Sequence, residues 1–214
     1  HVTQEDEPVT GFLTGNTYQM DDTVPFWHTE TGYSTAVEGC GTICVGNEYD
    51  QAINLLAYYN SIKANNFDDK IWFYDFADDG LRINEKEYNF GILHSHEYSV
   101  PYAAKYAYLT LSFLNKLVAA ATDCEEIFSE NYSFVTKYTC ADRTAYLLRS
   151  TAGAQTVTAS ALDLGDDVTY YDMLGNEIPE TSVKQGGEYY LDKEPFWAVT
   201  GTLPGGGSGA ADGT

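Results

Sequence analysis

Two short apolar runs, each followed by acidic residues and glycine, constrain the fold of this chain most. The first run, residues 24–30, is entered through a proline, ends in Glu30 and is followed by Gly32. In the second run, residues 70–76, five of the seven residues are aliphatic or aromatic, and Asp78-Asp79-Gly80 follows. Near-continuous apolar character is typical of strands that are covered on both faces of a parallel sheet.

A helical pattern lies between the two runs. Asn47 is a plausible N-cap, and Glu48 and Asp50 fall in the first turn, where the helix dipole favours acids. An apolar stripe follows at helical spacing, formed by Ala52, Leu55, Leu56, Tyr59 and Ile62. Strand, helix and strand in this order predict a βαβ unit with functional side chains at the ends of its strands.

The helical pattern of the sequence ends at Thr122 and gives way to short alternating runs. Before it, a second helix is expected with Ser99 as N-cap and Pro101 in its first turn. After it come six short alternating runs separated by glycine-containing turns: 132–138, 144–150, 156–164, 168–172, 188–191 and 196–200. They predict a small antiparallel β-sandwich over 122–202, and residues 203–214 read as a flexible Gly-rich linker.

The charge of the chain excludes several classes of partner. There are 32 acidic against 11 basic residues, a formal net charge of -21. Nucleic acids and anionic membrane surfaces need a basic face, so neither is expected to bind. No apolar run reaches the ~18 residues that span a bilayer. The 18 tyrosines suit neutral polar ligands such as sugars, although most of them can serve core and sheet packing.

The four cysteines predict local disulfide bonds and an extracellular location. Cys40 and Cys44 form a close pair, and Cys124 and Cys140 a wider one. Neither pair has zinc-ligand spacing, so no metal and no cofactor is expected. Two disulfides would fit a secreted protein; four buried free thiols are the alternative. No signal peptide is evident. The chain starts at His1, so we expect a processed product or a fragment.

Glu30 is the strongest candidate for chemistry in the chain. It ends the first apolar run, among Trp27, His28 and Tyr33. Burying a carboxylate is unfavourable unless it is paired, so this position suggests a functional group. The alternative is a strand-end glutamate that points into solvent.

Four passages together resemble, in the right order, the end of a clan A glycoside hydrolase. They cover residues 27–33 with Gln51-Ala52 (seventh βα unit), 71–80 (eighth strand), 88–93 with 100–104 (entry to the eighth helix) and 168–177 (C-terminal sandwich). The resemblance implies that residues 1–121 are the last part of a (β/α)8 barrel and that 122–202 are a small antiparallel β-sandwich. It extends over roughly residues 20–202.

The resemblance also implies roles for single residues. Glu30 would be the nucleophile of a retaining mechanism, with a second acid about 5–5.5 Å away. His28 and Tyr33 would orient Glu30 or the sugar. The remaining sugar contacts would come from Trp27, Trp72, Tyr74, Asp75 and Asp78.

The expected function is therefore the cleavage of β-glycosidic bonds in an oligo- or polysaccharide. A full barrel takes about 250 residues, so most strands and the acid/base would come from another chain or segment. The chain alone is expected to be inactive. The alternatives are a non-catalytic carbohydrate-binding or assembly protein derived from a glycosidase, or a different α+β unit over residues 1–120.

Overall fold

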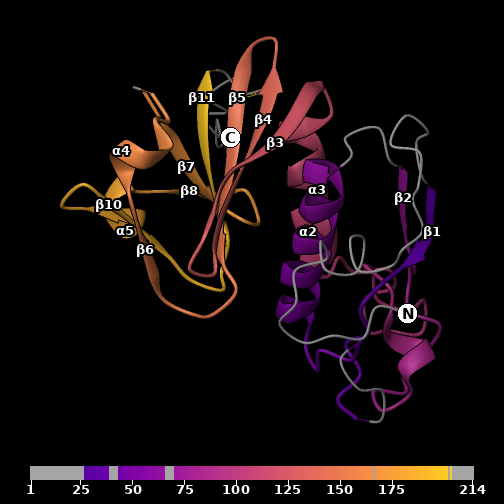
Figure 1. The fold of residues 1–214 in the computed structure, drawn as a ribbon. Coiled ribbons are helices and arrows are strands. Elements are labelled where there is room, and N and C mark those ends of the chain that lie inside the picture. The colour runs from indigo at the N-terminus through magenta and orange to yellow at the C-terminus, as the bar shows by residue number, and fades with distance from the viewer. Residues whose placement is uncertain (1–26, 39–42, 66–69, 166, 202, 204–214) are drawn as a thin grey trace, which may run out of the picture.

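The computed structural model describes residues 27–38, 43–65, 70–165, 167–201 and 203. They form a mixed α/β structure whose parallel strand pair, helices and antiparallel sheets lie side by side in Figure 1. Residues 24–26 of the first predicted strand, Cys40 and the predicted linker beyond Leu203 lie outside these residues. No helix among the described residues is both long enough and apolar enough to cross a membrane.

The predicted βαβ unit is confirmed. Strand β1 (Trp27–Thr31) pairs in parallel with β2 (Lys70–Phe73), and helix α2 (Glu48–Asn65) connects them. Asn47 caps α2 as expected, because its side-chain oxygen accepts the backbone N–H of Asp50 at 2.8 Å. The apolar stripe of α2 is buried, apart from the partly buried Tyr59.

The second helix begins later than the sequence indicated. Helix α3 (Tyr106–Val118) starts seven positions after Ser99, so the prediction of an N-cap there is wrong. The residues just before α3 run alongside an earlier segment, and the backbone N–H of Lys105 donates to the carbonyl of Ile92 at 3.1 Å. An extended segment paired in this way cannot also form a helical turn.

The rest of the chain forms two antiparallel sheets. The six-stranded sheet has the order β3 (Ala121–Glu130), β4 (Ser133–Cys140), β5 (Arg143–Ser150), β11 (Phe196–Gly201), β7 (Thr169–Asp172) and β8 (Glu177–Ile178). The three-stranded sheet has the order β6 (Gln155–Thr158), β10 (Glu188–Leu191) and β9 (Lys184–Gln185). Three short helical segments complete the structure: η2 (Lys86–Asn89), α4 (Ala159–Leu162) and α5 (Glu180–Val183). The run 156–164 is therefore a strand followed by a helix, and β3 was not predicted.

Two apolar clusters form the core. The first joins α2 and α3 to one face of the six-stranded sheet, with Leu56, Leu117, Tyr138 and Trp197 among its members. In it, the buried Asn60 side chain donates to the Thr136 hydroxyl at 2.6 Å and accepts from the Tyr138 hydroxyl at 2.9 Å. The second cluster packs side chains of the two sheets against each other. One face of the helix pair thus rests on the antiparallel sheet, and β1 and β2 lie on its other side (Figure 1).

The predicted Cys124–Cys140 disulfide is wrong, because both cysteines are free and buried. Cys124 lies opposite Tyr138 in the β3–β4 pairing, whereas Cys140 lies opposite Ala121. The two thiols thus occupy diagonal positions, which lie about 7–8 Å apart in a sheet. A disulfide needs β-carbons about 4 Å apart. The Cys40–Cys44 bridge stays a prediction.

Candidate functional site

Glu30 lies at the end of β1, where it is exposed and lines a cavity of about 450 Å³. The cavity wall comes from β1 and the turn after it, from the segment after β2, from α2 and from η2. Its lining residues are Trp27, His28, Thr29, Glu30, Thr31, Gly32, Tyr33, Ile43, Tyr58, Tyr74, Lys86, Glu87 and Phe90. The carboxyl ends of parallel strands meet at one edge of a sheet, so β1 and the chain leaving β2 reach the same opening.

Five of the predicted site residues are brought together around this cavity, and three are not. Trp27, His28, Glu30, Tyr33 and Tyr74 line it. Asp75 and Asp78 follow β2 but are not part of the lining. Neither is Trp72, whose ring packs on Trp27 with 5.3 Å between centroids and 42° between planes.

The two tryptophans mark the face of the strand pair that the helices leave open. Trp27 is 61% exposed and Trp72 46% exposed. Phe73, the neighbour of Trp72, points the other way and packs against the first core cluster. This alternation is the ordinary consequence of the two-residue period of a strand.

His28 contacts helix α2 through Tyr58. Its ring is buried, and Nδ1 lies 3.2 Å from the Tyr58 hydroxyl. Burial raises the pKa of Tyr58, so this hydroxyl stays protonated at neutral pH. Burial, with a smaller contribution from Tyr58, also raises the pKa of Tyr33 to about 12. The cavity therefore contains neutral phenol groups that can donate hydrogen bonds.

Tyr74 is surrounded by carboxylates. Burial raises the pKa of its phenol, and negative charge on Asp79, Asp75, Glu87 and Glu30 raises it further, in that order. Tyr74 therefore stays protonated at neutral pH. Its hydroxyl can donate a hydrogen bond, and the phenol interacts electrostatically with Glu30. Its ring also meets the ring of Phe90, with centroids 5.3 Å apart.

A glycine lets the chain after Glu30 approach the chain after β2. A β-carbon on Gly32 would lie 1.8 Å from the carbonyl oxygen of Tyr74, so no other residue fits this backbone position. The Tyr74 backbone N–H donates to the carbonyl of Thr31 at 2.6 Å. These contacts fix Glu30 relative to Tyr74.

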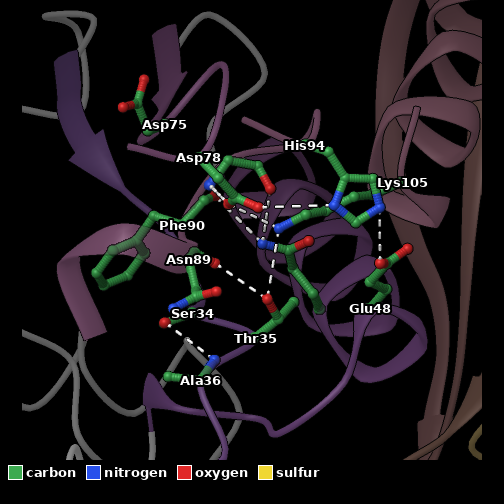
Figure 2. A network of polar contacts seen from close by, with 12 residues as sticks. Ser34, Thr35, Ala36, Glu48, Asp75, Asp78, Asn89, Phe90, His94 and Lys105 are labelled. Atoms are coloured by element: carbon green, nitrogen blue, oxygen red, sulfur yellow. Dashed lines mark hydrogen bonds and ion pairs between the residues drawn. The ribbon is translucent and has the colours of Figure 1, made fainter. Parts of the chain in front are cut away.

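A buried ion pair joins Asp78 and Lys105, which are not among the residues that line the cavity (Figure 2). Lys105, 1% exposed, places Nζ 2.7 Å from Asp78 Oδ1, and the same oxygen accepts the Gly91 N–H at 2.9 Å. Burial raises the pKa of Asp78 and lowers that of Lys105, and each charge opposes the shift of the other. Lys105 also reaches the Thr35 hydroxyl at 3.4 Å. Asp78 is thus committed to this network and lies outside the cavity lining.

Further polar contacts join the two cavity walls. The buried Gln51 amide donates to the carbonyls of Tyr33 at 2.8 Å and of Phe90 and Gly91 at 3.2 Å each. The Ser34 hydroxyl donates to the carbonyl of Lys86 at 2.8 Å. The segments on either side of the opening are therefore anchored to each other through buried groups.

Some lining residues carried no recognisable signal in the sequence. Lys86 and Glu87 belong to an irregular segment without periodicity, and they form an ion pair of 2.9 Å on the cavity wall. Phe90 could have been found, because it lies in the Asn89-Phe90-Gly91 passage that resembles the family. Within the described ranges, no three His, Cys, Asp or Glu side chains are grouped so that they could hold a metal ion.

Comparison with known proteins shows which fold this chain shares. No family model matches the sequence, and no curated protein does. A family 39 glycoside hydrolase from the gut symbiont Bacteroides cellulosilyticus WH2 is similar with a TM-score of 0.66 and 22% identity, over 83% of this chain and 34% of that one. The family 30 subfamily 8 xylanase Xyn30A from Clostridium acetobutylicum is similar with a TM-score of 0.51 and 9% identity, over 83% of this chain and 43% of that one. The chain therefore shares the fold of part of these glycoside hydrolases and spans less than half of their length.

Proposed function

We propose that this chain is the C-terminal part of a retaining glycoside hydrolase that cleaves β-glycosidic bonds of a polysaccharide, with Glu30 as the nucleophile. One observation carries the proposal: an exposed carboxylate at the end of a parallel strand lines an aromatic cavity of about 450 Å³. The size is within the range of cavities that hold small ligands.

The chemistry of this proposal follows from the groups around Glu30. Its carboxylate attacks the anomeric carbon through an oxocarbenium-like transition state and forms a glycosyl-enzyme as the glycosidic C–O bond breaks. The acid/base from another segment protonates the departing oxygen and then activates the water that hydrolyses the glycosyl-enzyme. Trp27 and Tyr74 offer ring faces to the sugar, and the protonated hydroxyls of Tyr33 and Tyr74 can donate hydrogen bonds to it.

The proposed architecture places β1 and β2 as the last two strands of a (β/α)8 barrel and the antiparallel sheets as its C-terminal sandwich. The exposed face of the strand pair supports this, because the strand face turned away from the helices lines the side-chain-filled interior of a closed barrel. The two similar enzymes are longer than this chain, which supports an acid/base supplied by another segment. The xylanase named among them favours a β-linked polysaccharide as substrate.

The experiment uses the complete enzyme that contains this chain. An electrophilic cyclitol epoxide should attach covalently to Glu30, as located by peptide mass spectrometry. Glu30→Ala should lower turnover of an aryl β-glycoside by about 10⁴-fold or more, and added azide should restore part of it.

Glu87 provides the matched control, since it is a carboxylate in the same cavity. Glu87→Gln should keep the epoxide label on Glu30. Attachment elsewhere, or full activity of Glu30→Ala, would refute the nucleophile assignment. Polysaccharide binding with neither labelling nor turnover would favour the alternative, a non-catalytic carbohydrate-binding protein derived from a glycosidase.

A further inference from the structure

The loop before α3 carries two pairs of aromatic rings, of which only the His94 ring is mostly buried. The rings of His94 and Tyr98 are stacked, with centroids 4.0 Å apart and planes at 7°. The rings of His96 and Tyr102 lie 6.5 Å apart at 33°. Tyr98 is 41% exposed and Tyr102 55% exposed. We call these four side chains the ring platform.

The backbone of this loop is well anchored. The carbonyl of the buried Ser95 accepts the N–H groups of both Tyr98, at 3.1 Å, and Tyr102, at 3.5 Å. The Ser95 hydroxyl also accepts the N–H of Glu97 at 3.2 Å. The backbone N–H groups of both tyrosines are therefore held by one carbonyl, which reduces the conformational entropy that is lost when a ligand binds.

The ring of His94 is held by two carboxylates. His94 places Nε2 3.1 Å from Glu48 and Nδ1 3.9 Å from Asp78. Figure 2 shows His94 between these carboxylates, with Lys105 beside it. Tyr98 thus stacks on a fixed ring and leaves its outer side accessible to a ligand.

The ring platform belongs to the same edge of the molecule as the cavity. Glu48 is the first residue of α2, and Lys105 immediately precedes α3, so the loop lies where both helices begin. Helix α2 begins beyond the end of β1, because it runs from there back to the start of β2 (Figure 1). Helix α3 begins near the end of β2, because Lys105 pairs with Asp78, which follows that strand. None of the four platform residues lines the cavity.

We propose that the ring platform is a second carbohydrate-binding surface, which holds a stretch of a neutral polysaccharide outside the cavity. Tyrosine rings present an apolar face to the C–H face of a pyranose, and their hydroxyls bind its polar edge. Residues 94–104 contain no lysine or arginine but do contain Glu97, and the chain carries a net charge of -21. This charge disfavours an anionic ligand. The choice of ligand class rests on the proposed function; the surface itself rests on the loop.

The test is affinity electrophoresis of the 214-residue chain in gels that contain arabinoxylan, mixed-linkage β-glucan or, as the anionic probe, polygalacturonate. The wild-type chain should be retarded by at least one neutral polysaccharide and not by polygalacturonate. Tyr98→Ala/Tyr102→Ala should weaken this binding by about tenfold or more, as expected for the loss of aromatic anchors. Circular dichroism checks that each variant is folded.

Two controls separate this inference from the proposed function. Tyr132→Ala removes another exposed tyrosine with a positive φ, in the β3–β4 turn, and should leave binding unchanged. Tyr74→Ala alters the cavity, so the retardation that remains in this variant comes from the platform. Binding that is lost in Tyr74→Ala but kept in the platform variant would overturn the second surface and leave the proposed function standing. No retardation of the wild-type chain, or retardation by polygalacturonate alone, would also overturn it.

Discussion

Replacing Lys105 with methionine should destabilise the chain severely. Its ammonium lies 2.7 Å from Asp78, and both side chains are buried, at 1% and 6% exposure. Methionine keeps most of the aliphatic stem but leaves the carboxylate without its cation. Removing one partner of a buried ion pair typically costs about 3–5 kcal/mol, because an uncompensated charge remains. That loss is a large part of the roughly 5–15 kcal/mol that holds an ordinary domain together.

The assay is urea unfolding at pH 7, followed by fluorescence. Lys137→Met is the matched control, because Lys137 lies 2.7 Å from Glu125 but both side chains are partly exposed, at 33% and 51%. An exposed pair contributes about 0–1 kcal/mol, so this variant should unfold almost like the wild type. Asp78→Asn/Lys105→Met removes both charges and should regain most of the lost stability.

The loss should also depend on pH. Burial already raises the pKa of Asp78 above its ordinary value of 3.8, and the Lys105 ammonium opposes that rise. Without Lys105 the folded-state pKa is higher still, so ionised Asp78 destabilises the folded variant. The stability deficit of Lys105→Met should be largest at neutral pH and shrink as the pH falls through the raised folded-state pKa towards the lower, ordinary pKa of the unfolded chain. A deficit below about 1 kcal/mol at pH 7, or one that grows on acidification, would refute this account of the pair.

Two further substitutions test a close backbone contact and a buried hydrogen-bond network. Gly32→Ala should lower the free energy of unfolding by about 2–3 kcal/mol or more, since its β-carbon would collide with the carbonyl oxygen of Tyr74; an unchanged urea midpoint would show that the strand end can relax. Asn60→Ala should lower it by about 3 kcal/mol, because two buried hydroxyls lose their partner. Asn54→Ala is the control for the second, since Asn54 makes an exposed contact only, and equal losses in both variants would contradict the buried-network explanation.

The sequence predicted those elements whose signals are local. Helix α2 was found because an asparagine cap, acids in the first turn and a buried stripe all agree. Strand β3 was missed because most of its side chains are exposed and two irregularities interrupt its pairing with β4. The start of α3 was misplaced because Lys105 pairs with Ile92, thirteen positions earlier, and Ser99 offers no sign of that pairing.

The candidate site was predictable to the same extent. A carboxylate at a strand end is visible in the sequence, and Glu30 does line the cavity. The direction in which a loop side chain points cannot be predicted from the sequence. In the sequence Asp78 looks like a sugar-binding residue, but in the structure Lys105, 27 positions later, pairs with its carboxylate. The fixed orientation of Tyr98 likewise depends on His94 and its carboxylate partners.

The shared core of helices and sheet limits how this chain can be recombined. Leu117 of α3 and Trp197 of β11 belong to one apolar cluster, and both are fully buried. A chimera joined near residue 121 would place Trp197 against unrelated helices and lose that fit. A crossover before Asn47 would keep α2, α3 and the sheet together. The antiparallel sheets are therefore expected to be inherited, or transplanted, together with the helices that cover them.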